Sequence, residues 1–423
     1  MNGLMVFLEE KVQPIGVKIG GQRHLLAVRD GLVLSMPLII VGSLFLVLSS
    51  LPIPGYQEFI GSIFGEEWTS TMGFVVNSTF GVMALISSFG IANSLVKSYS
   101  IDGNTAGIIS LCSLLLVTPL TKDNGIDMTY MGSKGLFVSL LIGLIVGEIY
   151  RRMVQAEIVI KLPDSVPPAV SKSFVALIPA AVCLTFFWVL RLVIASVGLG
   201  NLHEVIGKVV GVPLSYVGGG FIGGLVAVLV TGIFWSVGIL GWDLVQSVLN
   251  PLWLQMLDEN RLAFQAGKEI PHILNTTFFN VFVWMGGSGS IIGLAILLMF
   301  FSKSKQNKEL GKLGFPPNVF NISEPIMFGF PVVMNPLILI PFTITPIVIY
   351  IISYSAMVTG IVAKTAGILV PWTMPPIIGG YLATGGHISG AILQLVCLIV
   401  SIVIYYPFFR MIDNQYYQDE LQG

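Results

Sequence analysis

The sequence contains few charged residues. Only 10% of its 423 residues are Asp, Glu, Lys or Arg, compared with about 25% in an average soluble domain. Hydrophobic residues make up 54% of the chain, and the mean hydropathy is +0.87. The net charge is -1, and no basic block is available to neutralise a phosphate backbone, which argues against nucleic-acid binding. The composition predicts an all-α polytopic membrane protein whose outer surface meets lipid.

Cysteine is also scarce. The three cysteines, Cys112, Cys183 and Cys397, all lie within apolar runs, a pattern that indicates neither a disulfide framework nor a metal site. We expect them to pack as small hydrophobic side chains, and we expect no metal or other cofactor. A cleavable signal peptide is not evident, because residues 1–30 mix polar and apolar side chains instead of placing an apolar core after a short basic region.

Residues 1–30 form a predicted amphipathic N-terminal segment. Lys11, Lys18, Arg23 and Arg29 stand among spaced Leu, Val and Ile residues. This pattern is typical of a helix that lies on the cytoplasmic membrane surface. A simple basic tail is the alternative.

Ten apolar runs have roughly the twenty residues needed to span a membrane. We expect five crossings near 31–50, 73–95, 104–120, 135–150 and 173–198, and five more near 217–239, 242–257, 279–302, 333–357 and 388–410. The run 242–257 is the weakest, because it is short and contains Asp243. When it is included, fourteen Lys and Arg residues are cytoplasmic and five are external, which fits the positive-inside rule with both termini in the cytoplasm.

Two Gly- and Pro-rich stretches, 313–332 and 358–387, offer no unbroken span. We interpret each as a re-entrant hairpin, because irregular backbone at membrane depth is tolerated only where it is buried in protein or lines a watery cavity. Two broken segments in one half of a transporter point to its binding site. We therefore assign substrate binding and transport to residues 211–423, and a scaffold or dimerisation role to residues 31–210.

Glu324 is the most informative single residue. It lies in N-I-S-E-P-I-M-F-G-F-P-V-V-M-N-P (residues 321–336), among apolar side chains and three prolines, Pro325, Pro331 and Pro336. A charge at membrane depth costs at least about 2.5–3.5 kcal/mol, so such a carboxylate is a functional-site candidate by default. The alternative is a structural carboxylate that a neighbour neutralises or that caps a half-helix.

A proline-rich stretch precedes the fifth predicted crossing. In L-P-D-S-V-P-P-A-V-S-K-S-F-V-A-L-I-P (residues 162–179), Pro167 and Pro168 are suited to open a helix, with Asp164 and Ser165 as candidate caps. From physics alone, an ordinary proline-rich connector is the simpler interpretation.

The stretches 162–179 and 321–336, together with Y-L-A-T-G-G (381–386) and Y-Y-P-F-F (405–409), resemble a known family. They are similar to enzyme IIC, the membrane component of phosphotransferase-system sugar transporters of the lactose, cellobiose and diacetylchitobiose group. The resemblance implies a homodimer of ten-helix protomers in the bacterial cytoplasmic membrane, with dimer contacts from the first five helices. It also implies a β-linked disaccharide substrate and a separate IIB protein, whose phosphocysteine phosphorylates the sugar at the cytoplasmic side.

The resemblance assigns roles to individual residues. Glu324 matches the motif acid of the family, and it would accept hydrogen bonds from sugar hydroxyls and take the proton of the attacking hydroxyl. Trp372 would stack on a pyranose face, although a packing or interfacial role suits its position equally well. Asn280, Thr373 and Asn335 are further candidate contacts. The glycines that follow Asn280 suit close helix packing by physics alone.

One position departs from the family pattern. Members commonly carry G-I-H-G near the start of the seventh crossing, whereas this chain has G-I-L-G with Leu240. Trp242 and Asp243 are candidate sugar contacts in place of that histidine, and a different sugar or impaired coupling are the alternatives. Asp243 is an intramembrane carboxylate under this topology, or it caps the start of a helix.

Two functional hypotheses follow. The first is a phosphorylating sugar transporter of an elevator type, in which the C-terminal half slides against a fixed dimeric scaffold. The second is an ion-coupled or facilitative sugar transporter that uses Glu324 as a proton site without phosphorylation. The phosphate on the accumulated sugar distinguishes them.

Overall fold

The structure is a computed structural model that describes residues 10–11, 13–50, 55–163, 165–330, 332 and 335–422. Over these residues the chain is built from helices, and extended pairing is limited to one isolated bridge between Leu120 and Ile126. The expected all-α class is therefore confirmed.

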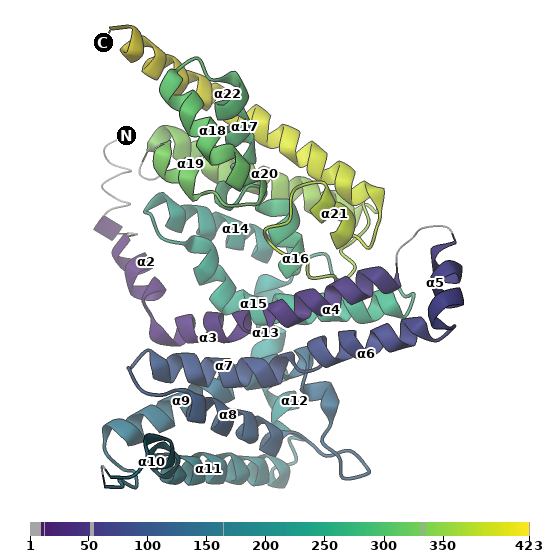
Figure 1. Cartoon of the computed structure of the whole chain (residues 1–423), viewed down its shortest axis with the longest axis vertical. Helices are drawn as coiled ribbons and strands as arrows, with labels where there is room; N and C mark the ends of the chain where they lie inside the picture. Colours follow the sequence, from purple (N-terminus) through teal and green to yellow (C-terminus); the bar gives the residue numbers. More distant parts are fainter. Residues whose placement is uncertain are drawn as a thin grey trace.

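Figure 1 shows the two halves of the chain packed on each other, with α3, α4 and α15 running between them. The helices of the N-terminal half are α2 (Gln13–Gly20), α3 (Arg23–Val33), α4 (Met36–Ser49), α5 (Tyr56–Phe64), α6 (Trp68–Phe80), α7 (Met83–Lys97), α8 (Asn104–Val117), α9 (Leu136–Gln155), α10 (Pro168–Val175), α11 (Leu177–Ser196) and α12 (Leu202–Ile206).

The C-terminal half contains both long helices and short broken ones. They are η4 (Gly207–Gly211), α13 (Val212–Gly218), α14 (Phe221–Ser236), α15 (Gly241–Gln265), α16 (Thr276–Phe278), η5 (Phe279–Val283), η6 (Ser288–Ser290), α17 (Ile292–Phe301), α18 (Lys305–Val319), α19 (Glu324–Gly329), α20 (Pro336–Val358), α21 (Ile378–Ala383) and α22 (Ile388–Gln422). The η4 and η5 turns are π-helical.

Six helical stretches in the described part of the chain are long and apolar enough to cross a membrane, or eight if two bent pairs each count as one span. Six predicted crossings coincide with these stretches: 31–50, 73–95, 135–150, 173–198, 333–357 and 388–410. The run 104–120 corresponds to the 14-residue helix α8, and 242–257 lies within the more polar α15. A multi-pass fold is therefore established, while the number of ten crossings stays a prediction.

Two bends lie at the crossings expected at 217–239 and 279–302. The helical segments Leu202–Gly218 and Phe221–Ser236 meet at 76°, and the segments Thr276–Ser290 and Ile292–Phe301 meet at 58°. The first bend lies at three successive glycines, 218–220, and the second follows the glycine-rich turn 286–289. Glycine weakens helix continuity because its backbone has the most conformational freedom.

The N-terminal half is organised around α3, α7 and α9. Gly31 on α3 and Gly90 on α7 approach so closely that a Cβ on Gly90 would lie 2.8 Å from the Cα of Gly31. Small residues permit such backbone contact between membrane helices. α2 exposes Ile15 and Val17, as expected of a helix on a membrane surface, and the predicted boundary at residue 30 falls inside α3.

Several contacts join the two halves. They include Arg29 Nη1 with Asp243 Oδ2 at 2.9 Å, Leu369 N with Ser43 Oγ at 2.8 Å, Ser133 Oγ with Asp258 Oδ2 at 2.6 Å, and the Arg261 guanidinium 4.7 Å from the Phe80 ring centroid. α15 supplies three of these partners, so this helix is the main link between the halves.

The proline-rich stretch before α11 contains a helix start at Pro168, the first residue of α10. Ser165 lies in a turn before it. The other candidate cap, Asp164, is outside the described residues.

Candidate functional site

The predicted hairpin 313–332 consists of the end of α18, a short turn and α19. Asn321 lies in the turn with φ at 63°, a left-handed conformation that Asn tolerates better than most residues. The chain therefore reverses at Asn321, and α19 packs against α18. Whether this hairpin enters a membrane stays a prediction.

Asn321 joins three segments that are far apart in the sequence. Its Nδ2 donates to the backbone carbonyls of Trp372 and Met374, the latter at 3.4 Å, and its Oδ1 accepts from the Gly286 backbone N–H. One side chain thus holds the Glu324 turn, the Trp372 loop and the glycine-rich turn 286–289 together.

Gly287 allows the closest of these approaches. Its φ is 90°, and a Cβ at this position would lie 2.7 Å from Ser323 Oγ and 2.9 Å from the Asn321 carbonyl oxygen. Any other residue would therefore be strained and would collide with the turn before α19. The glycine-rich stretch serves close packing here, which is the role that physics alone favours.

Glu324 is the first residue of α19 and is exposed. Among the described residues, no group forms a hydrogen bond or ion pair with its side-chain carboxylate. A carboxylate in the first turn of a helix is favourable because of the partial positive charge there. The structure gives no support to neutralisation by a neighbour, and it leaves both carboxylate oxygens able to accept hydrogen bonds from a ligand.

Trp372 lies on the loop between α20 and α21, and 54% of its surface is exposed. Thr373 beside it is half-buried. Because Asn321 holds the backbone of this loop while the indole ring remains exposed, the ring is available for stacking. Its exposure argues against a packing role within one protomer.

Ile377 ends the same loop in a strained conformation. Its φ is 75°, which is a genuine outlier for a β-branched residue. The Gln394 side chain on α22 stabilises this conformation, because its Oε1 accepts from Ile377 N at 2.6 Å and from Gly380 N at 2.5 Å, while its Nε2 donates to Val281 O at 2.7 Å. Backbone strain of this kind occurs preferentially at ligand sites.

Two predicted amides have different surroundings. Asn280 is half-buried in the π-helical turn η5, next to Val281, which Gln394 ties to the Ile377 loop. Asn335 is the N-cap of α20, and its Oδ1 accepts from Leu337 N at 3.1 Å. Capping thus accounts for the position of Asn335 without a ligand.

Trp242 and Asp243 form a second group in the first turn of α15. The Trp242 ring packs against Trp253, Phe279 and Trp284 at centroid distances of 5.6, 5.6 and 5.2 Å. Asp243 is paired with Arg29 on α3. These contacts give both residues structural partners.

Leu240 precedes α15 and is 50% exposed. It lines a cavity of about 200 Å³ together with Arg29 and Asp243. The position of the family's histidine is therefore next to an open space and an ion pair.

Two residues of the site escaped sequence analysis. Asn321 stands inside the Glu324 motif, and Gln394 is a polar residue in an otherwise apolar run. The isolated amide in that run is the one signal that pointed to Gln394, whereas the partners of both residues are visible only in the fold.

The chain is similar to known proteins over almost its whole length. A family model described as "Phosphotransferase system, EIIC" matches residues 29–346. The lichenan permease IIC component of Bacillus subtilis (strain 168) is 48% identical, over 99% of this chain and 96% of the relative. The cellobiose-specific EIIC component of Geobacillus stearothermophilus is 46% identical, over 98% of this chain and 95% of the relative.

A solved structure has the same fold. The transporter ChbC, the IIC component of the N,N'-diacetylchitobiose-specific phosphotransferase system, superimposes with a TM-score of 0.95 at 46% identity, covering 98% of this chain and 99% of ChbC. Identity of this level over the whole length shows common descent as well as a common fold. The chain therefore belongs to the EIIC family of phosphotransferase-system sugar transporters, which are multi-pass proteins of the bacterial inner membrane.

Proposed function

We propose that this protein binds a β-linked disaccharide, moves it across the membrane and presents it to a phosphorylated IIB protein. The cellobiose, lichenan and diacetylchitobiose relatives support this substrate class. The observation that carries the proposal is the bonding of Asn321 to the Trp372 loop. It brings together two separate proline-rich segments, one with an exposed indole and one with a carboxylate that no described residue pairs with.

The two exposed side chains have complementary roles. The Glu324 carboxylate accepts hydrogen bonds from sugar hydroxyls, and the Trp372 ring stacks on a pyranose face. Thr373 and Asn280 supply a hydroxyl and an amide at the edge of the same region, and Asn335 contributes through the start of α20. Trp242 and Asp243 contact the sugar from the side of the site near Leu240. The ion pair with Arg29 holds Asp243 in position there.

Phosphorylation needs a donor and a base. A sugar hydroxyl oxygen attacks the phosphorus of the IIB phosphocysteine, the sulfur–phosphorus bond breaks, and the thiolate leaves on IIB. The hydroxyl proton passes to Glu324, which a positioned carboxylate in a low-dielectric site can accept.

The assembly that fits this function has ten crossings and two re-entrant hairpins, with both termini in the cytoplasm. Two copies associate through residues 31–210, and residues 211–423 move against that scaffold as an elevator. During that movement, polar contacts between the halves such as the Arg29–Asp243 pair would be exchanged.

The test measures both uptake and product. Membrane vesicles that contain the protein and internal phospho-IIB receive labelled cellobiose and diacetylchitobiose, and we expect the label to accumulate as sugar phosphate. Glu324→Gln should abolish binding or phosphorylation while the protein stays folded. Glu309→Gln is the matched control, because Glu309 is an exposed carboxylate on α18 that pairs with Lys312. Accumulation of unmodified sugar would instead identify an ion-coupled or facilitative transporter.

A further inference from the structure

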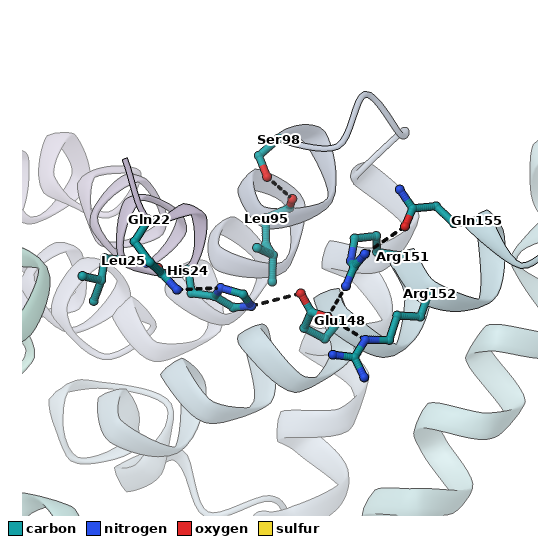
Figure 2. A network of polar contacts seen from close by, with 9 residues as sticks. All are labelled: Gln22, His24, Leu25, Leu95, Ser98, Glu148, Arg151, Arg152 and Gln155. Carbon is teal, nitrogen blue, oxygen red and sulfur yellow. Dashed lines mark hydrogen bonds and ion pairs between the residues drawn. The ribbon is translucent and has the colours of Figure 1, made fainter. Parts of the chain in front are cut away.

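A polar network lies where α3 begins and where α7 and α9 end (Figure 2). The Glu148 carboxylate on α9 is its centre. It accepts hydrogen bonds from His24 Nε2 at 3.0 Å, Arg151 Nη2 at 2.5 Å and Arg152 Nε at 2.9 Å. Both oxygens of Glu148 are thus engaged by cationic or imidazole groups.

Tyr99, just after α7, gathers two of the cations. The guanidinium carbons of Arg23 and Arg151 each lie 4.2 Å from its ring centroid, which is favourable cation–π geometry. With Lys97 and Arg152, four permanent cations stand at these helix ends. This end of the bundle is the one that the distribution of Lys and Arg predicts to be cytoplasmic.

A groove of about 260 Å³ opens beside the network. Its lining combines three aliphatic and three polar side chains, Leu144, Ile145, Ile149, His24, Glu148 and Arg152. Leu144 and Arg152 are eight residues apart on α9, or about 12 Å along the helix. The groove therefore runs from Arg152, near the C-terminal end of α9, toward aliphatic side chains in the middle of the candidate span Ser133–Gln155.

We propose that this groove binds an anionic phospholipid, with the phosphate against Arg152 and one acyl chain along Leu144, Ile145 and Ile149. A phospholipid has the same division between an anionic group and apolar chains, and the inner leaflet of the membrane is rich in anionic headgroups. Arg152 suits the phosphate because 73% of its side chain is exposed, even though its Nε donates to Glu148. The proposal does not depend on which sugar is transported.

The experiment uses the purified full chain in detergent, with phosphatidylglycerol and phosphatidylcholine as probes and native mass spectrometry as the readout. Wild type should bind phosphatidylglycerol more tightly. Arg152→Gln should weaken phosphatidylglycerol binding about fivefold, the effect of one interfacial cation, and should leave phosphatidylcholine binding unchanged. Lys312→Gln is the matched control, because Lys312 is exposed and pairs with an acid three residues away but does not line this groove.

Ile145→Trp tests the acyl-chain part, since an indole would fill the groove, and binding of phosphatidylglycerol should fall. Equal binding of the two lipids, or equal effects of Arg152→Gln and Lys312→Gln, would overturn the proposal. Competition by glycerol phosphate as effective as that by the intact lipid would indicate a soluble-anion site instead. A change of oligomeric mass in Ile145→Trp would indicate that a protein surface covers the groove.

Discussion

Asn321 shows how one side chain joins the segments of the proposed binding region. Its amide bonds to Gly286, Trp372 and Met374, so the exposed carboxylate of Glu324 and the exposed indole share one anchor. The amide need not touch the sugar in this proposal. It positions the two groups that we propose as sugar contacts.

The first prediction concerns this anchor. Asn321→Ala removes the three bonds, each worth about 0.5–1.5 kcal/mol, and we expect sugar affinity measured by calorimetry to fall roughly tenfold or more. Asn201→Ala is the control, because it removes the N-cap bond to Glu204 on the remote helix α12 at a comparable cost in stability. Unchanged sugar affinity in Asn321→Ala would show that Asn321 does not position the sugar site.

The second prediction concerns Trp372. Trp372→Ala should weaken sugar binding by about 0.5–1.5 kcal/mol beyond the loss of contact area, and Trp372→Phe should retain part of the affinity. Calorimetry with the same sugar gives the comparison. Trp188 on α11 is 52% exposed, so Trp188→Ala is the matched control and should bind normally. Equal affinities of wild type and Trp372→Ala would contradict the stacking role.

The third prediction concerns Leu240, which stands where the family pattern G-I-H-G implies a histidine. The cavity of about 200 Å³ beside Leu240 has room for an imidazole, and Asp243 on its wall offers a hydrogen-bond acceptor. Leu240→His should therefore fold and should restore or broaden sugar binding across a panel of β-disaccharides. Leu240→Phe controls for size alone. If Leu240→His bound the same sugars with the same affinities as wild type, position 240 would not be part of the sugar site.

At the scale of an element, α15 differs most from its predicted form. The apolar run was expected to end at 257, but the helix continues to Gln265. The added turns carry Asp258 and Arg261, whose side chains are only 8% and 5% exposed and form a 2.7 Å ion pair. Two charges this close neutralise each other, so they can be buried against the N-terminal half.

The fourth prediction tests that pair. Arg261→Met leaves the Asp258 carboxylate buried with only the Ser133 hydroxyl bound to it, and breaking a buried pair in this way costs about 3–5 kcal/mol. We expect a clear decrease in the midpoint of thermal unfolding in detergent. Lys312→Met breaks an exposed pair and should change stability by less than about 1 kcal/mol. Similar midpoints for the two variants would show that the Arg261 pair contributes little.

The glycine-rich turn 286–289 is the other element that defines the site. The glycines in the sequence indicate that the backbone of this turn packs closely against another segment. The structure identifies that segment as the turn from Asn321 to Ser323. The sequence cannot identify the segment that packs against a glycine, because glycine has no side chain whose chemistry would indicate a partner.

At the scale of the whole molecule, the proposed transport mechanism requires residues 211–423 to move against residues 31–210. The backbone N–H of Leu369 bonds to Ser43 Oγ at 2.8 Å across the boundary between the halves. This contact brings the two chain segments within the range of an engineered crosslink.

The fifth prediction uses that contact. The double variant Ser43→Cys and Leu369→Cys, made with Cys112→Ser because Cys112 is exposed, should stop accumulation of sugar phosphate when oxidised, and a reductant should restore it. Sugar binding to the oxidised protein should persist in this conformation. Ser43→Cys alone serves as the control. Full uptake by the crosslinked protein would exclude relative movement of the halves at this contact.

The sequence by itself determined the membrane class, the helical fold and the two segments that carry Glu324 and Trp372. These follow from local properties: the cost of charge in hydrocarbon, the length of apolar runs, and the breaking of helices by proline and glycine. These local properties did not predict the buried charge pair in α15 or the bends at glycines, because both depend on neighbours supplied by other helices.

Only the tertiary structure decided which segments meet. Asn321 bonds to residues 35 and 51 positions away, Gln394 connects α22 to η5 and α21, and Trp242 and Asp243 have structural partners of their own. Amide side chains can bond to any backbone group within reach, so their type alone leaves the partner undetermined. The packing of the helices selects that partner.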